Sequence, residues 1–487
     1  MKSTTLLLLS CLFVRLSAQK TPGIPNYDPE KKYSVEQVQF DLAILKDALI
    51  KIHPGLYWYQ SETEFEATYQ KQIRSVKKAM TELELYYSVM ALLSAIKCSH
   101  TGASLSKNFD QHFEKNKKLF PFGVRQIGNE LYVSRNYSDD STIVLGSKLI
   151  SINGITTDSI LKYFKNFSWG DGYAQSSAML EWDFVAFFAF YFYSEKYVVN
   201  ILDPLGNSNT VEAKAVDDGT FRRVQKRYEP IYNSGYRPFR FKMIDSLNTA
   251  LIRIDQFMGR GYKRFLSRSF RTMREKETKN LIIDLRGNTG GEDYYGRLLY
   301  SYFALNDFKY YDRLEVAIKD PNDSIFKYAK MPLGKLTTKF FYAFKLRKAE
   351  NGKYYFKSNA HINLSNKAFK PKKNNFKGRV YILTDDESFS ATSEFCAIAK
   401  YNNRVTFVGR ETGGGYCGNS SGDEVVLTLP NTKIRVIIPL IRYFSAVEGT
   451  CGRGIKPDYP LAETVSDLTE NRDSDLLFIL DLTKKAR

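Results

Sequence analysis

The chain is 487 residues long, with 43% hydrophobic, 14% aromatic and 25% charged side chains. This is an ordinary globular composition, which excludes a collagen-like or intrinsically disordered protein. Lys and Arg number 71 against 53 Asp and Glu, and the resulting charge of +18 is compatible with anionic partners but does not indicate one. Five Cys in this length exclude a miniature fold held together by disulfides.

Residues 1–18 are expected to be a signal peptide. Lys2 precedes a short apolar run, and small residues ending at Ala18 form a cleavage site. The run is far shorter than the roughly 20 residues that span a bilayer, which argues against a membrane anchor. The four residues ending at Cys11 faintly resemble a lipobox, so a lipid tether there is a minor alternative. We therefore expect a secreted or periplasmic protein without an integral membrane span.

Residues 19–117 are expected to form a helical domain. Ser34, Ser61 and Thr81 each precede Glu or Gln by three residues, the spacing of a capping box at a helix start. Apolar residues at helical spacing follow the first of these boxes, and His53 and the proline after it end that helix. The pattern predicts three successive helices.

Residues 118–216 change to short strands and turns. The run from Gly146 to Gly154 resembles a strand and turn of a PDZ domain, a module that captures extended peptides along a sheet edge. An ordinary β-hairpin in a mixed domain is the alternative. We expect a PDZ-like, β-rich domain.

From residue 217 to residue 487, strands and helices alternate, which predicts a βαβ-type α/β core. Strands are expected at 250–257, 280–285, 379–384 and 404–408, helices near 262–277, 292–304 and 390–401, and a hairpin around Pro430. A basic insertion at about 305–378 interrupts this core. Basic runs with aromatics can bind nucleic acid, but no recognition motif accompanies this one, so we expect a solvated insertion and no nucleic-acid partner.

The cysteines of an exported chain can oxidise. Cys417 and Cys451 lie in Gly-rich loops and are the preferred pair, with free buried thiols as the alternative. Cys-x-x-Cys and His-rich spacings are absent, and the chain has only four His. No metal site and no cofactor are therefore expected.

Ser390 is the best candidate nucleophile. It lies between a predicted strand and a predicted helix, where free N–H groups and the helix dipole favour developing negative charge. The alternative is that Ser388 or Ser390 merely caps the helix. A second glycine-rich turn, Asp284 to Gly291, follows another strand and could direct N–H groups into a cleft. A dinucleotide-binding loop there is disfavoured, because neither G-x-G-x-x-G nor a Walker A motif is present.

Together these segments resemble the C-terminal-processing (tail-specific) and tricorn-core serine peptidase family. That family has a D-x-R-x-N-x-G-G turn, here Asp284 to Gly291, followed by a Ser-Ala nucleophile motif, here Ser390-Ala391. The V-G-x-x-T-x-G turn at 408–414 and the G-x-x-P-D segment ending at Asp458 also match in order. The resemblance implies a ClpP/crotonase-type α/β core with a helical N-terminal domain and a PDZ-like domain.

The residue that serves as base differs between branches of the family. Tail-specific members place a Lys between glycines after the V-G-x-x-T turn, whereas this chain has only Gly413 to Gly415 there. Tricorn-like members use a His preceded by Ser and assisted by a Glu. Ser99, His100 and Glu448 match these roles, although an ordinary surface or packed His and a solvated carboxylate are the alternatives. His53, which looks structural, and His112, which has no nearby motif, are competing bases.

The resemblance therefore implies a secreted, tricorn-like serine endopeptidase that cleaves peptides through an acyl-enzyme on Ser390 with His100 as general base, without metal or cofactor. The oxyanion donors implied are the Ala391 N–H and an N–H of Gly290 or Gly291. A disulfide between the two loop cysteines would brace the segment carrying Glu448. The rival reading is a non-proteolytic binding protein for apolar ligands or peptides on the same scaffold.

Overall fold

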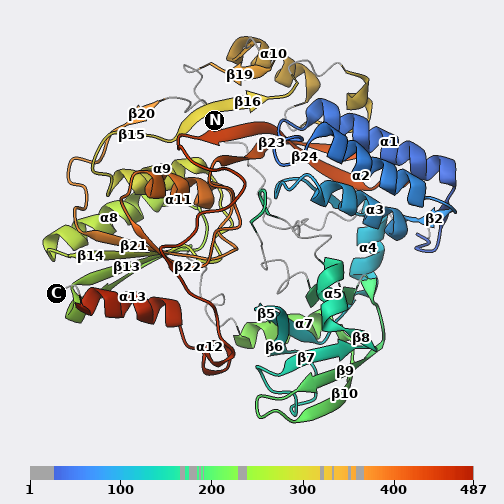
Figure 1. Ribbon diagram of the computed structural model, residues 1–487, viewed down its shortest axis with the longest axis horizontal. Coiled ribbons are helices and arrows are strands. Elements are labelled where there is room, and N and C mark those ends of the chain that lie inside the picture. Colours follow the sequence, from blue (N-terminus) through green and yellow to red (C-terminus); the bar gives the residue numbers. More distant parts are fainter. Residues whose placement is uncertain are drawn as a thin grey trace.

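The computed structural model describes residues 27–164, 170–174, 184–185, 188–189, 191–228, 238–318, 323–331, 334–348, 353–357 and 367–485. The expected signal peptide lies outside these residues. Helices from the N-terminal part, a β-rich part and a C-terminal α/β core lie around a common centre (Figure 1). Strands β23 (Gly418–Thr428) and β24 (Arg435–Ser445) run between the core and the N-terminal helices.

The N-terminal part contains the three predicted helices. They are α1 (Val35–Ile52), α2 (Glu62–Ser75) and α3 (Glu82–Ser94), preceded by a two-stranded pairing of β1 (Lys32–Tyr33) with β2 (Met80–Thr81). All three capping boxes form, because Ser34, Ser61 and Thr81 each accept from the backbone N–H three residues on. The sequence prediction of these helix starts is confirmed. Helix α4 (Lys107–Asn116) follows them.

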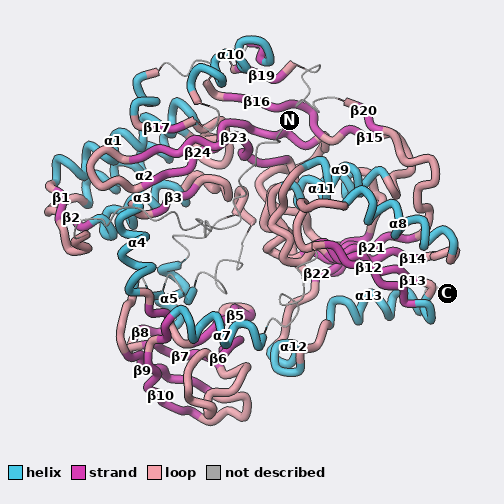
Figure 2. Tube along the Cα trace, turned by 180° about the vertical axis from the view of Figure 1, so that it is seen from behind, coloured by secondary structure: helices cyan, strands magenta, loops and turns pink. Residues whose placement is uncertain are grey.

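The β-rich part is built on one mainly antiparallel sheet. Its strands are β10 (Ser208–Lys214), β9 (Lys196–Leu202), β7 (Lys148–Ile152), β6 (Glu130–Asn136) and β5 (Phe122–Ile127), in that order, with β8 (Ile155–Thr156) paired to β7. Helices α5 (Thr157–Phe164) and α7 (Asp218–Tyr228) and the pair β4 (Lys118–Leu119) with β11 (Val216–Asp217) complete it. It lies at the bottom of both views (Figures 1 and 2) and touches the C-terminal segment of the chain, where Arg125 of β5 lies 3.8 Å from the Glu463 carboxylate.

The α/β core contains the predicted mixed sheet. Its order is β12 (Phe239–Ile244), β13 (Thr249–Ile254), β14 (Asn280–Asp284), β21 (Arg379–Thr384), β22 (Thr406–Gly409) and β25 (Tyr459–Pro460). The pairs from β13 to β25 are parallel, and only β12 runs antiparallel. The predicted α/β core is therefore confirmed.

Helices cover both faces of this sheet (Figure 1). Helices α8 (Tyr262–Glu275), α9 (Asp293–Ser301) and α11 (Ala391–Tyr401) lie on one face, and α13 (Ser474–Lys485) lies on the other, beyond the short α12 (Val465–Glu470). Alternate residues of β14 divide between the faces: Ile282 belongs to the apolar cluster with Ile479 of α13, whereas Leu281 and Ile283 belong to the larger core. Burial on both faces explains why these strands are continuous apolar runs.

A second sheet joins the core to the N-terminal helices. Its order is β17 (Ala329–Lys330), β23 (Gly418–Thr428), β24 (Arg435–Ser445), β16 (Tyr311–Val316), β19 (Tyr354–Phe356) and β18 (Leu346–Lys348). Strands β23 and β24 form the hairpin predicted around Pro430. The short strand β3 (Gly102–Ser104) also pairs with β24, antiparallel, through Arg435 to Ile437.

The region expected to be a basic insertion supplies part of this second sheet. It also contains α10 (Lys335–Lys345) and the short pair of β15 (Phe308–Lys309) with β20 (Ala368–Phe369). Of the helices in the described part of the chain, none combines the length and the apolar character needed to cross a bilayer.

A buried carboxylate fastens α1 to the β23–β24 hairpin. Asp41 is fully buried and accepts hydrogen bonds from the backbone N–H groups of Asn431 and Thr432, at 2.9 Å each, and from both of their side chains. These donors compensate the cost of burying the charge. The N-terminal helices are thereby fixed to the same hairpin that receives β3.

We predict that Asp41→Asn lowers the free energy of unfolding by about 2–4 kcal/mol. The NH₂ group of the amide would face the N–H and O–H donors of Asn431 and Thr432, and these buried donors would lose an acceptor. Urea denaturation followed by circular dichroism measures this loss. The matched control on the same helix is Asp47→Asn, whose half-exposed carboxylate pairs with Lys51 and is worth at most about 0.5 kcal/mol. Equal losses in both variants would contradict the prediction.

Candidate active site

Ser390 occupies a strained turn between β21 and α11. Its backbone has φ 52° and ψ −129°, a conformation that a residue with a side chain adopts only at a cost of about 1–3 kcal/mol. The side chain makes no capping hydrogen bond to α11, and Ser388 instead donates to the Leu285 carbonyl. Neither serine is therefore a helix cap of the kind considered from the sequence. The Ser390 hydroxyl remains partly exposed.

His100 lies within hydrogen-bond distance of this hydroxyl. The distance from His100 Nε2 to Ser390 Oγ is 3.1 Å, although the two residues are 290 positions apart in the chain. His100 sits in a turn closed by a hydrogen bond from Thr101 N–H to the Cys98 carbonyl, directly before β3. Because β3 pairs with β24 of the second sheet, the turn is held against the α/β core.

The other imidazole nitrogen faces a second serine and a buried aspartate. Ser99 Oγ lies 3.1 Å from His100 Nδ1 and donates to Asp171 Oδ1 at 2.9 Å. An ionised carboxylate can only accept hydrogen bonds, so the Ser99 hydroxyl donates its one hydrogen to Asp171. The Ser99 oxygen must then accept from His100 Nδ1–H. Nε2 therefore carries the free lone pair and faces Ser390, which is the tautomer that a general base requires.

Asp171 is 1% exposed and is held by backbone donors as well. It accepts from the Ser99 N–H at 3.0 Å and from the Gly415 N–H at 3.3 Å. Its loop is fastened to the core by hydrogen bonds from Asp171 N–H to the Gly413 carbonyl and from Tyr173 N–H to the Gly452 carbonyl. The carboxylate is thus held between the Ser99 turn of the N-terminal part and the Gly415 loop of the α/β core.

Asp171 is not among the residues predicted from the sequence. The only sequence signal is its position between Gly170 and Gly172, which is typical of a tight loop. The structure explains Gly172: it has φ 72°, and a Cβ there would lie 2.5 Å from the Gly452 carbonyl oxygen. Close packing against Gly452 thus requires the glycine beside the aspartate, but nothing in the sequence relates the two loops.

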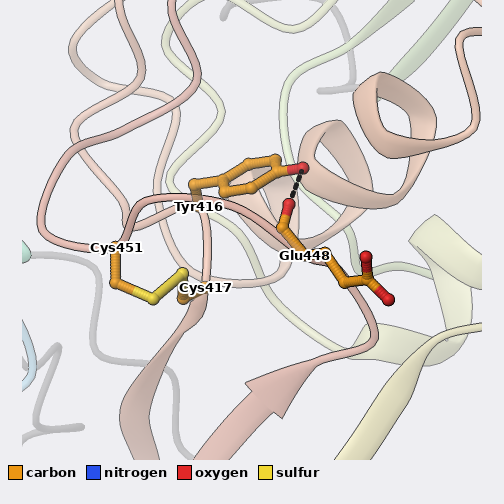
Figure 3. Close-up of a disulfide and its surroundings, with 4 residues drawn as sticks. All are labelled: Tyr416, Cys417, Glu448 and Cys451. Carbon is orange, nitrogen blue, oxygen red and sulfur yellow. Dashed lines mark hydrogen bonds between the residues drawn. A yellow bond between two sulfur atoms is a disulfide. The ribbon is translucent and has the colours of Figure 1, made fainter.

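Glu448, the residue expected to act on Ser99, lies elsewhere. It is exposed, its carbonyl accepts from Tyr416 Oη at 3.2 Å, and its carboxylate points away from the nearby disulfide (Figure 3). The expected contact between Ser99 and Glu448 is therefore wrong, because Asp171 occupies the position on Ser99.

The predicted disulfide between Cys417 and Cys451 is present (Figure 3). It does not brace a catalytic Glu448. Instead it joins the strand that follows Gly415 to the segment that contains Gly452, the two segments that hold the Asp171 loop. Cys98 and Cys396 are free thiols.

The two glycines at the end of β14 differ in what their N–H groups bind. Gly290 N–H donates to the Asn288 side chain at 3.0 Å, whereas Gly291 N–H has no acceptor among the described residues. Gly290 has φ 108°, and a Cβ there would lie 2.7 Å from the Ser390 Cβ, so this backbone packs directly on the nucleophile turn. Ala391 is the first residue of α11, where backbone N–H groups have no acceptor within the helix.

Hydrogen bonds also fix the glycine turn after β14 to the turn that carries Ser390. Asp385 accepts from the Gly287 N–H through both carboxylate oxygens, at 3.0 and 2.9 Å, and Phe389 N–H donates to the Asn288 carbonyl at 3.2 Å. Burial raises the pKa of Asp385, and the neighbouring Asp386 acts in the same direction. The glycine turn and the nucleophile turn therefore behave as one structural unit.

The imidazoles near the site have separate roles. Burial lowers the pKa of His100, and the charge of Asp171 partly opposes this shift. His53 is buried, and burial lowers its pKa to about 3. Its Nδ1 accepts from the Gly55 N–H, so Nε2 donates to Thr101 Oγ1 at 2.8 Å and supports the His100 turn. His112 lies on α4 beside the Tyr27 ring.

A buried carboxyl group lies behind the nucleophile. Glu394, four residues after Ser390 on α11, accepts from Asn419 Nδ2 at 2.8 Å and from the Tyr311 hydroxyl. Burial raises the pKa of Glu394 to about 7, and the charge of Asp293 adds to the shift. These contacts connect the nucleophile helix to β16 and β23.

The α/β core is similar to a known family of peptidases. Residues 248–461 match the model of peptidase family S41. Residues 248–461 form an S41 peptidase domain. This domain contains Ser390 and the glycine turn, and it makes the chain a serine-type peptidase. The resemblance to the C-terminal-processing and tricorn-core family is thereby confirmed. His100, Ser99 and Asp171 lie outside the matched residues.

The likeness in fold to solved structures extends beyond residues 248–461. The structure of mature CPAF complexed with lactacystin has a TM-score of 0.64 at 13% identity, over 93% of this chain and 98% of that chain. A second structure of mature CPAF has a TM-score of 0.62 at 14% identity, over 92% and 97%. At such identities the likeness is one of fold. No curated protein matches the chain.

We predict that Asp171→Asn lowers kcat/KM by roughly 10²–10⁴-fold, because an amide can donate to Ser99 and thereby favour the wrong His100 tautomer. Glu448→Gln is the matched carboxylate-to-amide control and should change kcat/KM less than about twofold. Peptide hydrolysis by the purified variants measures both. A larger loss of kcat/KM in Glu448→Gln than in Asp171→Asn would show that Glu448, and not Asp171, acts on Ser99.

We predict a pH-dependent stability caused by Glu394. Its pKa is raised from 4.5 to about 7, so between these values the folded chain retains a proton that the unfolded chain has released. The free energy of unfolding should therefore fall as pH rises through this interval, by up to about 3 kcal/mol from this group. Glu394→Gln should flatten that dependence, and exposed Glu275→Gln should not. Thermal unfolding at pH 5 and pH 7.5 measures the difference.

Proposed function

We propose that the protein is an exported serine peptidase in which Ser390 attacks the peptide carbonyl and His100 acts as general base. The observation that supports this most directly is the continuous hydrogen-bonded series Ser390–His100–Ser99–Asp171, with distances of 3.1, 3.1 and 2.9 Å. The buried negative charge of Asp171 stabilises the imidazolium that forms when His100 accepts a proton.

The reaction follows from this protonation pattern. His100 Nε2 removes the proton from Ser390 as Oγ bonds to the carbonyl carbon, and the carbonyl oxygen becomes an oxyanion. The protonated Nε2 then gives its proton to the leaving amine, and an acyl-enzyme on Ser390 remains. Water, deprotonated by the same nitrogen, hydrolyses this ester and releases the second product.

The N–H groups of Gly291 and Ala391 are proposed to bind the oxyanion. The sequence left Gly290 and Gly291 equivalent, but Gly290 N–H already donates to Asn288, which favours Gly291. The Gly290 N–H bond to Asn288 instead holds the turn in shape against Ser390.

Export and peptide capture complete the proposal. The N-terminal run of the sequence supports secretion or transfer to the periplasm, and the disulfide suits an oxidising compartment. The antiparallel sheet of the β-rich part ends in β5 on one side and β10 on the other, and these edges are proposed to add a strand of an extended substrate, as PDZ-like domains do.

We expect Ser390→Ala and His100→Ala each to lower kcat by roughly 10⁴–10⁶-fold on an unfolded protein substrate. A fluorophosphonate probe should label the wild type at Ser390, label His100→Ala much more slowly and leave Ser390→Ala unlabelled, as mass spectrometry of the peptides shows. His112→Ala is the matched control and should retain activity. Cleavage by Ser390→Ala at the wild-type rate would refute the proposed nucleophile, and unchanged activity in His100→Ala would refute the base.

A further inference from the structure

Three side chains of different chemistry converge behind the catalytic imidazole. Cys98, His100 and Asp171 each place one potential metal-ligand atom so that these atoms lie within 4.8 Å of one another. They form the one group of three or more such side chains found in the described part of the chain. Neither the S41 assignment nor the proposed reaction uses Cys98.

Local structure explains the convergence. The turn from Cys98 to Thr101 places Cys98 and His100 two residues apart on one loop, and the Ser99 N–H between them holds Asp171 at 3.0 Å. The thiol contacts the Ser420 carbonyl at 3.5 Å on β23, which fixes it beside the imidazole. His100 retains exposed surface, so an ion can reach the group from the imidazole side.

We propose that Cys98, His100 and Asp171 form an inhibitory zinc site that reversibly switches the peptidase off. A thiolate, an imidazole and a carboxylate are the ligands Zn²⁺ prefers, and the two anions balance its charge. In a tetrahedral zinc site, neighbouring ligand atoms are about 3.5 Å apart, so a contraction of at most about 1.3 Å assembles it. A water molecule or the Ser99 hydroxyl completes the coordination.

Binding inactivates the base through its tautomer. The imidazole nitrogen on the Asp171 side is Nδ1, which carries a proton in the active arrangement. Zinc takes the Nδ1 lone pair, so the imidazole proton moves to Nε2, and the thiol releases one proton to solvent as its sulfur binds. Nε2–H cannot accept the Ser390 proton. The effect on activity rests on the proposed function, whereas zinc binding itself does not.

The sequence offered no sign of this site. Zinc motifs are recognised from regular Cys and His spacing, and here a Cys-x-His pair combines with an aspartate 71 residues after the histidine. Only the docking of the Asp171 loop on the core brings the third ligand into place. The expectation that the chain has no metal site rested on spacing alone.

Zinc chloride titrated into the wild-type peptidase in non-chelating buffer should reduce hydrolysis of an unfolded protein at micromolar concentration, and EDTA should restore it. Cys98→Ala should remain active and require at least about 100-fold more zinc, since even partners of a metal ligand contribute 10–100-fold. Cys396→Ala is the matched control, because it removes the other free thiol and should stay fully sensitive. Equal sensitivity of Cys98→Ala and the wild type would overturn the site.

Cobalt(II) tests binding without any activity. Added to the inactive Ser390→Ala protein, it should give the visible bands of a tetrahedral site and a near-ultraviolet thiolate-to-cobalt band, and zinc should abolish both. The double variant Ser390→Ala/Cys98→Ala should lack the thiolate band. If the cobalt bands appear but the wild type has no peptidase activity, the zinc site is supported and the proposed function is refuted. If the wild type is active but shows no zinc inhibition, and the cobalt bands are absent, only the zinc site is refuted.

Discussion

The pairing of β3 with β24 is the constraint on which the active site depends. It places the turn that carries His100 against the α/β core, where Ser390 lies at the start of α11. Three residues of β3 take part, so the backbone contact alone is small. The carboxylate of Asp41 reinforces it, because it fastens α1 to the tip of the same hairpin. His100 and Ser390 are therefore held by the same support although they belong to different parts of the chain.

The hydrogen-bonded series at the site draws on a third part of the chain. Asp171 belongs to the described segment 170–174. It is buried without a cation within ion-pairing distance among the described residues, so N–H and O–H donors balance its charge. Such a charge depends on accurate positioning, since each lost donor leaves the carboxylate less well solvated. The disulfide from Cys417 to Cys451 joins the segments that provide this positioning. The same loops therefore position the carboxylate that contacts His100 through Ser99.

Ser390, the proposed nucleophile, is supported differently. Ser390 holds a strained backbone, and the surrounding contacts impose it: Gly290 packs on its Cβ, and Asp385 ties the glycine turn to the loop before it. Strain of this kind persists only where neighbouring structure over-determines it. The same packing keeps the hydroxyl away from the role of a helix cap and directs it to the imidazole.

Local features of the chain were predictable from sequence because they depend on neighbours. The capping residue of α1, Ser34, acts on a backbone N–H three positions away, and the apolar runs of the parallel strands reflect burial on both faces. The order of motifs likewise predicted the peptidase core and the Cys417–Cys451 disulfide, and it singled out Ser390 as the candidate nucleophile. Asp171 and the choice between Gly290 and Gly291 were not predictable. A carboxylate's partner, or the acceptor of a particular N–H, depends on which distant loops pack together, and only the tertiary structure decides that.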